Sequence, residues 1–480
     1  MSGGEAAAPG GPEPLAVAEP GRAAVWLALG YAARSLAYAG IVVILGRLFG
    51  PADFGAISLF LAFSAGIAYL AGSWPFLAIP LLAAEGGRIE AVAAATIRIA
   101  LAGAAVVAVL FLPAQAVMRD DADPVLAVVT LAYAAGLLGL SAVYAVYQTL
   151  GAMSSIATAQ TAERLVGVVA LGALALVGTS SVRAAEAALA VSALLLLAGV
   201  VLALRRRGVR LTLRRQGDAP PFRLVLGRVG PMVVVTVTAY LVAWMDLFFV
   251  GAFRDADEVG HYALAYQLFT LVIQFAALWV TAALPYQLRH AKSGGGAADR
   301  ASLVWSTAAW SAAVAAVAVA GQWVVVPVMG EEFEPAVAPS ALLLIAATAV
   351  SGYYAAVPRV LARQGARDVA RVSAVGFVIN LVLDLALIPW LGGWGAVIAT
   401  GVTLFYATAA LVAVDAGWRT SLTVMAAGLP AAAAIGLSVA ADTPAVQGVV
   451  LAALLAGLAF SAHCAWRQRR TTTATETETD

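Results

Sequence analysis

The stretch LGRLFGPADFG, residues 45–55, ends one long apolar run, and VGAFRDADEVG, residues 250–260, ends another. Matching residues recur at an offset of 205 positions, without a gap: Gly46 with Gly251, Gly55 with Gly260, Leu59 with Leu264, Trp74 with Trp279 and Pro80 with Pro285. Glycine, tryptophan and proline matches in one register are hard to obtain by chance, even in an alanine-rich chain. The pattern therefore predicts an internal repeat.

Each copy of this stretch has the composition of one helix end followed by a new helix. Glycine or proline interrupts the first helix, and an acidic residue, Asp53 or Glu258, stands near the start of the next, where the helix dipole favours negative charge. The glycine that follows permits close contact with another helix.

The overall composition is that of an integral membrane protein. Of 480 residues, 62% are hydrophobic and 11% are charged, and the mean hydropathy is +0.92. A soluble domain carries about 25% charged residues. One core cannot hide this much apolar surface, so lipid is expected to be the solvent for much of it.

Other compositional features limit the classes of function. A net charge of +1 gives no field that would attract nucleic acid, which is therefore not expected as a partner. The single cysteine, Cys464, excludes an intrachain disulfide, and three scattered histidines lack metal-ligand spacing. Neither a cofactor nor a metal ion is expected.

Apolar runs of about 20 residues predict fourteen membrane-spanning helices. They lie near residues 23–48, 54–83, 91–113, 124–150, 154–178, 184–204, 229–253, 260–288, 302–329, 336–358, 372–391, 394–414, 421–441 and 446–466. The predicted fold class is an all-α integral membrane protein with two pseudo-symmetric six-helix lobes and two C-terminal helices. The predicted domains are a disordered N-terminus at 1–22, lobes at 23–204 and 223–418, a basic linker at 205–222, accessory helices at 419–466 and a disordered tail at 467–480.

The positions of basic residues support this count, because cationic loops stay in the cytoplasm. Alternate span ends carry Arg22, Arg88, Arg289, Lys292, Arg300, Arg359, Arg363, Arg367, Arg371 and Arg419, with basic clusters at 205–216 and 467–470 and with Arg223 and Arg228. The opposite ends carry only Arg47, Arg119, Arg183 and Arg254, within loops that are otherwise acidic. The protein is expected in the cell (plasma or inner) membrane, with both termini cytoplasmic.

An even number of helices separates the two copies, so both lobes run the same way through the membrane. Parallel lobes are related by an axis along the membrane normal and can face one another across a central cleft. Rocking of the lobes could open that cleft to either side, which favours a transporter.

Three stretches resemble the bacterial polysaccharide flippases of the multidrug/oligosaccharidyl-lipid/polysaccharide exporter superfamily. They are GRLFGPADFGAISLFLA at 46–62, the region from WMDLFFVGAF to EVGHYALAYQ at 244–267, and INLVLDLALIPWLGGWGAVIAT at 379–400. The resemblance implies two six-helix lobes and two accessory helices. It also implies a flippase that moves undecaprenyl-pyrophosphate-linked oligosaccharide from the inner to the outer leaflet, with that glycolipid and membrane lipids as partners. Whether other polysaccharide-assembly proteins are partners stays open.

Alternative functions within and outside this superfamily are also considered. Lipid II flippases usually carry an Asp-Ala-Phe element in the first loop, where this chain has Asp53, Phe54 and Gly55, and this difference favours the polysaccharide branch. A multidrug cation exporter would prefer an acidic, aromatic cavity, and the three arginines inside the first-lobe spans argue against that function. A membrane glycan polymerase or ligase would need catalytic groups, and the sequence shows no nucleophile–base pair or phosphate loop, so the protein is not expected to be an enzyme.

Arg34, Arg98 and Arg164 lie within spans one, three and five, at similar depth from the cytoplasmic ends. Charges inside a membrane are costly and mark functional sites by default. Because guanidinium groups bind phosphate oxygens in pairs, these residues predict a cationic cavity for a pyrophosphate, with Arg34 the most important. The alternative is that each arginine snorkels to the interface.

Asp246 and Asp384, with Asn380 one turn before Asp384, are the corresponding polar residues of the second lobe. They are candidates for coupling transport to protons or sodium, although either aspartate could instead pair structurally. Gln267 and Gln274, like Gln148 and Gln160, could bind sugar hydroxyls or join neighbouring helices. Tyr353 and Tyr354 are interpreted as packing residues.

Overall fold

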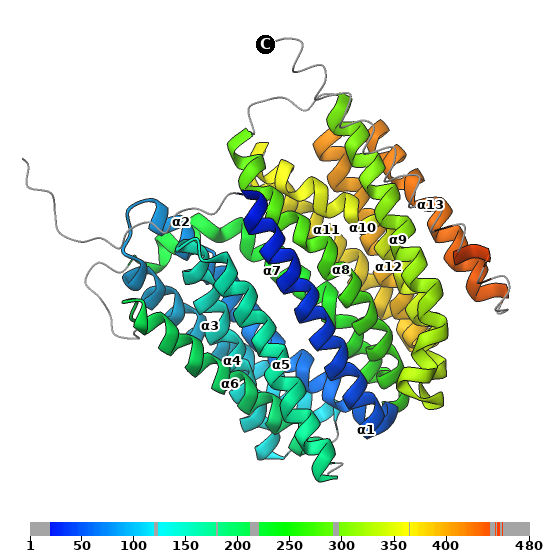
Figure 1. Ribbon diagram of the computed structural model, residues 1–480, viewed down its shortest axis with the longest axis horizontal. Coiled ribbons are helices and arrows are strands. Elements are labelled where there is room, and N and C mark those ends of the chain that lie inside the picture. Colours follow the sequence, from blue (N-terminus) through cyan, green and yellow to red (C-terminus); the bar gives the residue numbers. More distant parts are fainter. Residues whose placement is uncertain are drawn as a thin grey trace, which may run out of the picture.

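The computed structural model describes residues 20–441, except 120–122, 179–180, 212–219, 291–296 and 364, together with 447, 449–451 and 454. This described part contains thirteen α-helices, one 3-10 helix and no strand (Figure 1). Helices are expected in lipid, where a backbone N–H or C=O can find a partner only within the chain. They are α1 (Pro20–Phe76), α2 (Ala78–Ala84), α3 (Ile89–Met118), α4 (Pro124–Thr149), α5 (Met153–Val177), α6 (Val182–Arg206), α7 (Phe222–Phe253), α8 (Ala256–His290), α9 (Ala297–Met329), η1 (Glu331–Ala336), α10 (Val337–Arg363), α11 (Ala366–Leu391), α12 (Gly393–Ala416) and α13 (Trp418–Ala441).

The structure confirms the predicted fold class. Eleven helical segments of the described chain are long and apolar enough to cross a membrane. The longest, α1, joins the first two predicted spans across Gly50, where the backbone turns at φ 68°. The fourteenth predicted span, 446–466, lies mostly outside the described residues, as do the tail and most of the N-terminus, although α1 begins at Pro20 rather than at residue 23.

The two lobes repeat one packing pattern. In the first lobe α5 packs against α1 and α6, and in the second lobe α11 packs against α7 and α12. The α4–α6 contact likewise recurs as α10–α12. Figure 1 shows the first lobe, in blue to green, beside the second, in green to orange, with α13 against the outer side of the second lobe, where it contacts α9 and α12. The sequence repeat is therefore a structural repeat.

The repeated helix end makes a close contact between the lobes. In the first copy Gly50 breaks the helix, and in the second copy the Asp255 carboxylate accepts a hydrogen bond from the Glu258 N–H at 2.9 Å and so begins α8. The repeat glycines meet: a Cβ added at Gly55 would lie 2.8 Å from the Gly260 nitrogen. Only glycine at both positions allows the two backbones this approach.

An arginine also joins the lobes at this end. Arg47 of α1 donates through Nε to the Val328 carbonyl at 2.6 Å and through Nη2 to the Pro327 carbonyl. The last carbonyl groups of a helix lack partners within it, and these two lie at the C-terminal end of α9. The lobes are therefore closed against each other here.

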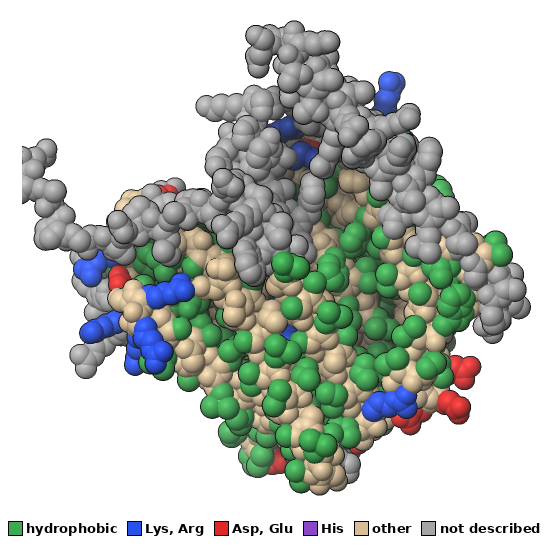
Figure 2. All heavy atoms as spheres, viewed as in Figure 1, with side chains coloured by type: hydrophobic (Ala, Val, Ile, Leu, Met, Phe, Trp, Pro, Cys, Tyr) green, Lys and Arg blue, Asp and Glu red, His purple; other side chains and the backbone are tan. Residues whose placement is uncertain are grey.

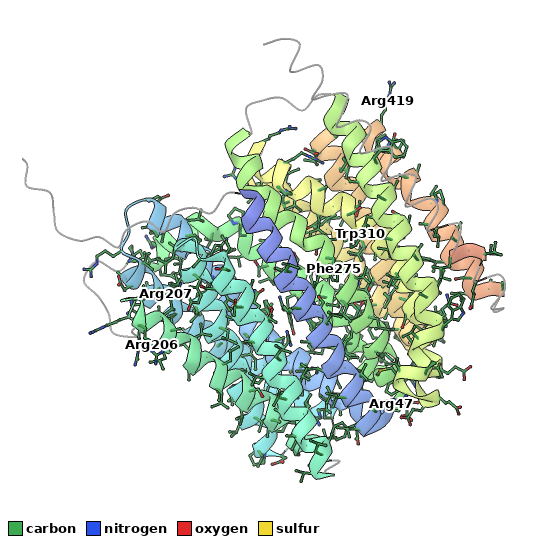
Figure 3. All side chains as sticks on the ribbon, in the orientation of Figure 1. Arg47, Arg206, Arg207, Phe275, Trp310 and Arg419 are labelled. Carbon is green, nitrogen blue, oxygen red and sulfur yellow. The ribbon has the colours of Figure 1, made fainter. Side chains whose placement is uncertain are left out.

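This closed end of the molecule, which carries Gly50, Arg254 and residues 331–334, is called the acidic end below, and the opposite end the basic end. Arg206, Arg207 and Arg419 lie at the basic end, far from Arg47 (Figure 3). Hydrophobic side chains cover the middle of the face shown in Figure 2, as expected for a surface in contact with lipid.

The charge distribution between the two ends leads to a topology prediction. Reporter proteins fused after residues 216, 294 and 366 should read as cytoplasmic, and fusions near 121 and 256 should read as external, because basic loops are retained inside. Paired alkaline phosphatase and fluorescent protein fusions would measure this. If the fusions at 216 and 256 report the same side, the order of spans is wrong.

Candidate functional site

A cavity of about 570 Å³ lies between the two lobes. Its walls come from α1, α4 and α5 of the first lobe and from α7 and α8 of the second. The described residues that line it include three charged ones, Arg34, Glu163 and Arg164, which together carry a net positive charge. Arg34 is 16 residues from the Gly50 turn, or about 24 Å along the helix, so the charged wall lies well toward the basic end.

Arg164 of α5 is held within this wall by aromatic and acidic neighbours. Its guanidinium carbon lies 5.0 Å from the centroid of the Tyr38 ring, and its Nη2 lies 3.7 Å from Glu163 Oε1. The Tyr144 hydroxyl donates to the other oxygen of Glu163 at 3.2 Å. Arg164 Nε is buried without a partner, so the guanidinium retains an unused donor for an anion.

Arg34 enters the same cavity from α1. Its guanidinium carbon lies 5.8 Å from the centroid of the Tyr31 ring, and its side chain is partly exposed. Tyr38 follows one turn later on the same helix face and stands beside Arg164. Arg34 and Arg164 therefore line one cavity from two helices.

Two of the predicted binding residues do not line the cavity. Arg98 of α3 is partly buried away from it and interacts elsewhere in the protein. Gln267 of α8 is buried and donates to the Ser58 hydroxyl at 3.0 Å, so it joins the lobes rather than facing open space. Gln160 and Gln274 do line the cavity.

The aromatic lining was not predicted from the sequence. Tyr38, Tyr69, Tyr133, Tyr144, Tyr240 and Trp244 all line the cavity. The Tyr240 hydroxyl also donates to the Ala62 carbonyl at 2.7 Å, across the lobe interface. The spacing of Tyr38 four positions after Arg34 was the one available signal, because it places both on the same helix face.

A second cavity, of about 330 Å³, adjoins the first. It lies within the second lobe, and the two share a wall made of Ala239, Ala243, Trp244, Thr270 and Gln274. Tyr353 and Tyr354 line this second cavity, with ring centroids 5.5 Å apart. The sequence interpretation treats both as packing residues only, whereas in the structure both also line a cavity.

Asp246 is the centre of a buried polar cluster in the second lobe. Its Oδ2 accepts hydrogen bonds from the Tyr262 hydroxyl at 2.9 Å and from the Thr400 hydroxyl. Asn380 and Asp384 approach it from α11. Asp246 is 1% exposed and the two α11 residues are fully buried, so the cluster unites the three residues predicted for ion coupling.

Several oxygen atoms of this cluster have no partner. They are Asp246 Oδ1, Asn380 Oδ1 and both carboxylate oxygens of Asp384. In the described part of the chain, no basic side chain pairs with either aspartate. Two buried carboxylates without a counter-charge are costly, and a cation or protons bound there would remove that cost. Thr400 also lines the second cavity, so the cluster lies directly behind its wall.

The described part of the chain forms a multi-span membrane protein whose two helical lobes enclose a cationic cavity, and solved structures share this fold. A structure titled lipid II flippase MurJ, inward closed conformation, has a TM-score of 0.68 and 10% identity, over 92% of this chain and 99% of that one. The eukaryotic MATE transporter AtDTX14 has a TM-score of 0.61 and 13% identity, over 86% and 99% of the two chains. A mutant of the Vibrio cholerae MATE transporter VcmN has a TM-score of 0.56 and 14% identity, over 85% and 96%.

The sequence profile of the family described as Polysaccharide biosynthesis protein matches residues 21–289, more than half of the chain. The chain belongs to this family, which confirms the resemblance noted in the sequence. The comparison with curated proteins gives no match.

Proposed function

We propose that this protein is a secondary transporter that moves polyprenyl-pyrophosphate-linked oligosaccharide from the inner to the outer leaflet for cell-surface polysaccharide assembly. The observation that carries the proposal is the pair Arg34 and Arg164 at one cavity between two lobes, in a chain of the polysaccharide biosynthesis family. Guanidinium groups suit the diphosphate because each can donate two hydrogen bonds to phosphate oxygens.

Alternating access follows from where the lobes are closed. They meet at the acidic end through Gly55, Gly260 and Arg47, whereas the charged wall of the cavity lies toward the basic end. With the basic end cytoplasmic, a state closed at the acidic end is the one that would receive substrate from the inner leaflet. Separation at the acidic end and closure at the basic end would release it outside.

The direct test is a flipping assay with purified protein in proteoliposomes. Polyprenyl-pyrophosphate-linked oligosaccharide should cross the bilayer in the presence of the protein and not in protein-free vesicles. Lipid II and a lipophilic organic cation, tested in parallel, address the other transport functions considered for the superfamily. Movement of either one in place of the oligosaccharide lipid would overturn the proposal.

Under this proposal, the buried cluster of Asp246, Asn380 and Asp384 couples transport to a proton or sodium gradient, which is the energy source. A proton or a sodium ion bound there can bias the two states of the transporter only if it binds one state better than the other. Asparagine keeps the shape of aspartate but removes the charge. Asp246→Asn and Asp384→Asn should each reduce gradient-driven flipping to the level without a gradient, while the protein remains folded in the membrane.

The measurement compares flipping with and without an imposed proton or sodium gradient. Asp368→Asn is the matched control, because Asp368 lies on the same helix as Asp384 but forms an exposed ion pair with Arg371 at 2.9 Å. Full gradient response in both cluster variants would exclude these aspartates as the coupling site.

A further inference from the structure

The second-lobe cavity has a lining quite different from that of the first. Among the residues that the structure describes, none that lines it is Asp, Glu, Lys, Arg or His. Its walls combine the aromatic rings of Trp244, Tyr266, Tyr353 and Tyr354 with the hydroxyl groups of Thr238, Thr270, Thr400, Thr403 and Ser373. Such a site suits a neutral ligand with both apolar faces and many hydroxyl groups.

Unused polar atoms in this cavity also indicate a ligand. Thr403 is 2% exposed, and its hydroxyl oxygen has no partner. The Gln274 side-chain oxygen, on the wall shared with the first cavity, is likewise buried without one. A buried polar atom without a hydrogen bond carries a free-energy cost. An alkyl chain bound here would not reduce that cost, whereas the hydroxyl groups of a ligand could donate the missing hydrogen bonds.

The charges in and around this cavity do not favour an organic cation as its ligand. Aromatic rings alone can hold a cation, but the described lining offers no carboxylate, and Arg34 and Arg164 line the adjoining cavity. Asp246 is not among the residues that line this cavity, and its Oδ2 accepts hydrogen bonds from the hydroxyls of Thr400 and Tyr262.

We propose that the second-lobe cavity is a binding subsite for the neutral sugar nearest the diphosphate, so that the first lobe binds the phosphates and the second lobe selects the glycan. This rests on the proposed function. The shared wall places the sugar beside the phosphates without any movement of the lobes, since Trp244, Thr270 and Gln274 face both cavities.

The test measures the affinity of purified protein in nanodiscs for two probes. One is undecaprenyl pyrophosphate without sugar, and the other is the undecaprenyl-pyrophosphate-linked oligosaccharide extracted from membranes of the source cells. Wild-type protein should bind the glycan-bearing lipid at least tenfold more tightly. Tyr354→Leu and Thr403→Val, at positions that line the second cavity alone, should each lower this preference, to about threefold or less, without weakening binding of the bare lipid.

Matched controls make the result specific. Tyr406→Leu and Thr423→Val change the same residue types outside both cavities. Tyr406 lies on the same helix as Thr403, and Thr423 is exposed on α13. Both control variants should retain the wild-type preference for the glycan-bearing lipid. Thr403→Val is nearly isosteric, so it keeps the test valid if Tyr354→Leu fails to fold.

The possible failures can be told apart. Wild-type protein that binds neither lipid above the phospholipid background would overturn the proposed function. Two results with wild-type protein that binds both lipids would overturn the sugar subsite alone. In the first, neither cavity variant lowers the preference for the glycan-bearing lipid. In the second, the variants weaken the binding of both lipids equally. Wild-type binding of both lipids with equal affinity would also overturn the subsite.

Discussion

Arg34→Ala and Arg164→Ala should each reduce the rate of glycolipid flipping by about 10- to 100-fold in proteoliposomes. A hydrogen bond to a charged group contributes roughly 1.5–3 kcal/mol, and each 1.4 kcal/mol is a factor of ten. Both residues line the cavity between the lobes, and Arg164 has a buried Nε with no partner. Lysine at either position should restore part of the rate, because it keeps the charge but not the bidentate geometry.

Arg98→Ala is the control for this experiment. Arg98 is an intramembrane arginine of the same lobe, but it does not line the cavity, so its replacement should leave flipping within about twofold of wild type. Protein levels in the vesicles must be matched. Normal flipping by the Arg34→Ala/Arg164→Ala double variant would contradict the cationic-cavity hypothesis.

Gly260→Ala should open the acidic end of the molecule. An added Cβ would overlap the Pro51 carbonyl oxygen, which belongs to the backbone and cannot rotate away. Overpacking of this kind costs about 1–3 kcal/mol, and the state in which the lobes are closed at the acidic end bears that cost alone. The balance between the two states should shift roughly 10- to 100-fold toward the outward-open one, and flipping should fall.

The shift can be followed by thiol labelling. With Cys464, the single native cysteine, replaced by serine, a Ser141→Cys substitution places one thiol in the cavity lining. A membrane-impermeant reagent added outside should label the Gly260→Ala protein faster than its parent. Gly199→Ala is the control, because no atom of the described residues lies within 4 Å of a Cβ added to that helical glycine. Equal labelling of all three proteins would contradict the steric argument.

The sequence alone predicted the all-α membrane fold and the internal repeat. Apolar length and the Gly and Pro interruptions are local properties, so they predict helices and their ends directly. The sequence also predicted the register that makes Gly55 equivalent to Gly260. Equivalent positions of two lobes meet only where both lie beside the axis that relates the lobes, so the contact itself came from the tertiary structure. The sequence also singled out Arg34, Arg164, Asp246 and Asp384 as candidate site residues, because each is a charged residue inside a predicted span.

Only the tertiary structure decided which of the candidate side chains face open space. It brought Arg34, Arg164 and Gln274 to the cavity, left Arg98 and Gln267 outside it, and placed Tyr354 on a second cavity. The physical reason is the nearly uniform apolar surface of these alanine-rich helices. A helix that is apolar all round carries no periodic signal of its rotation about its own axis, and that rotation is set by packing against neighbours distant in the sequence.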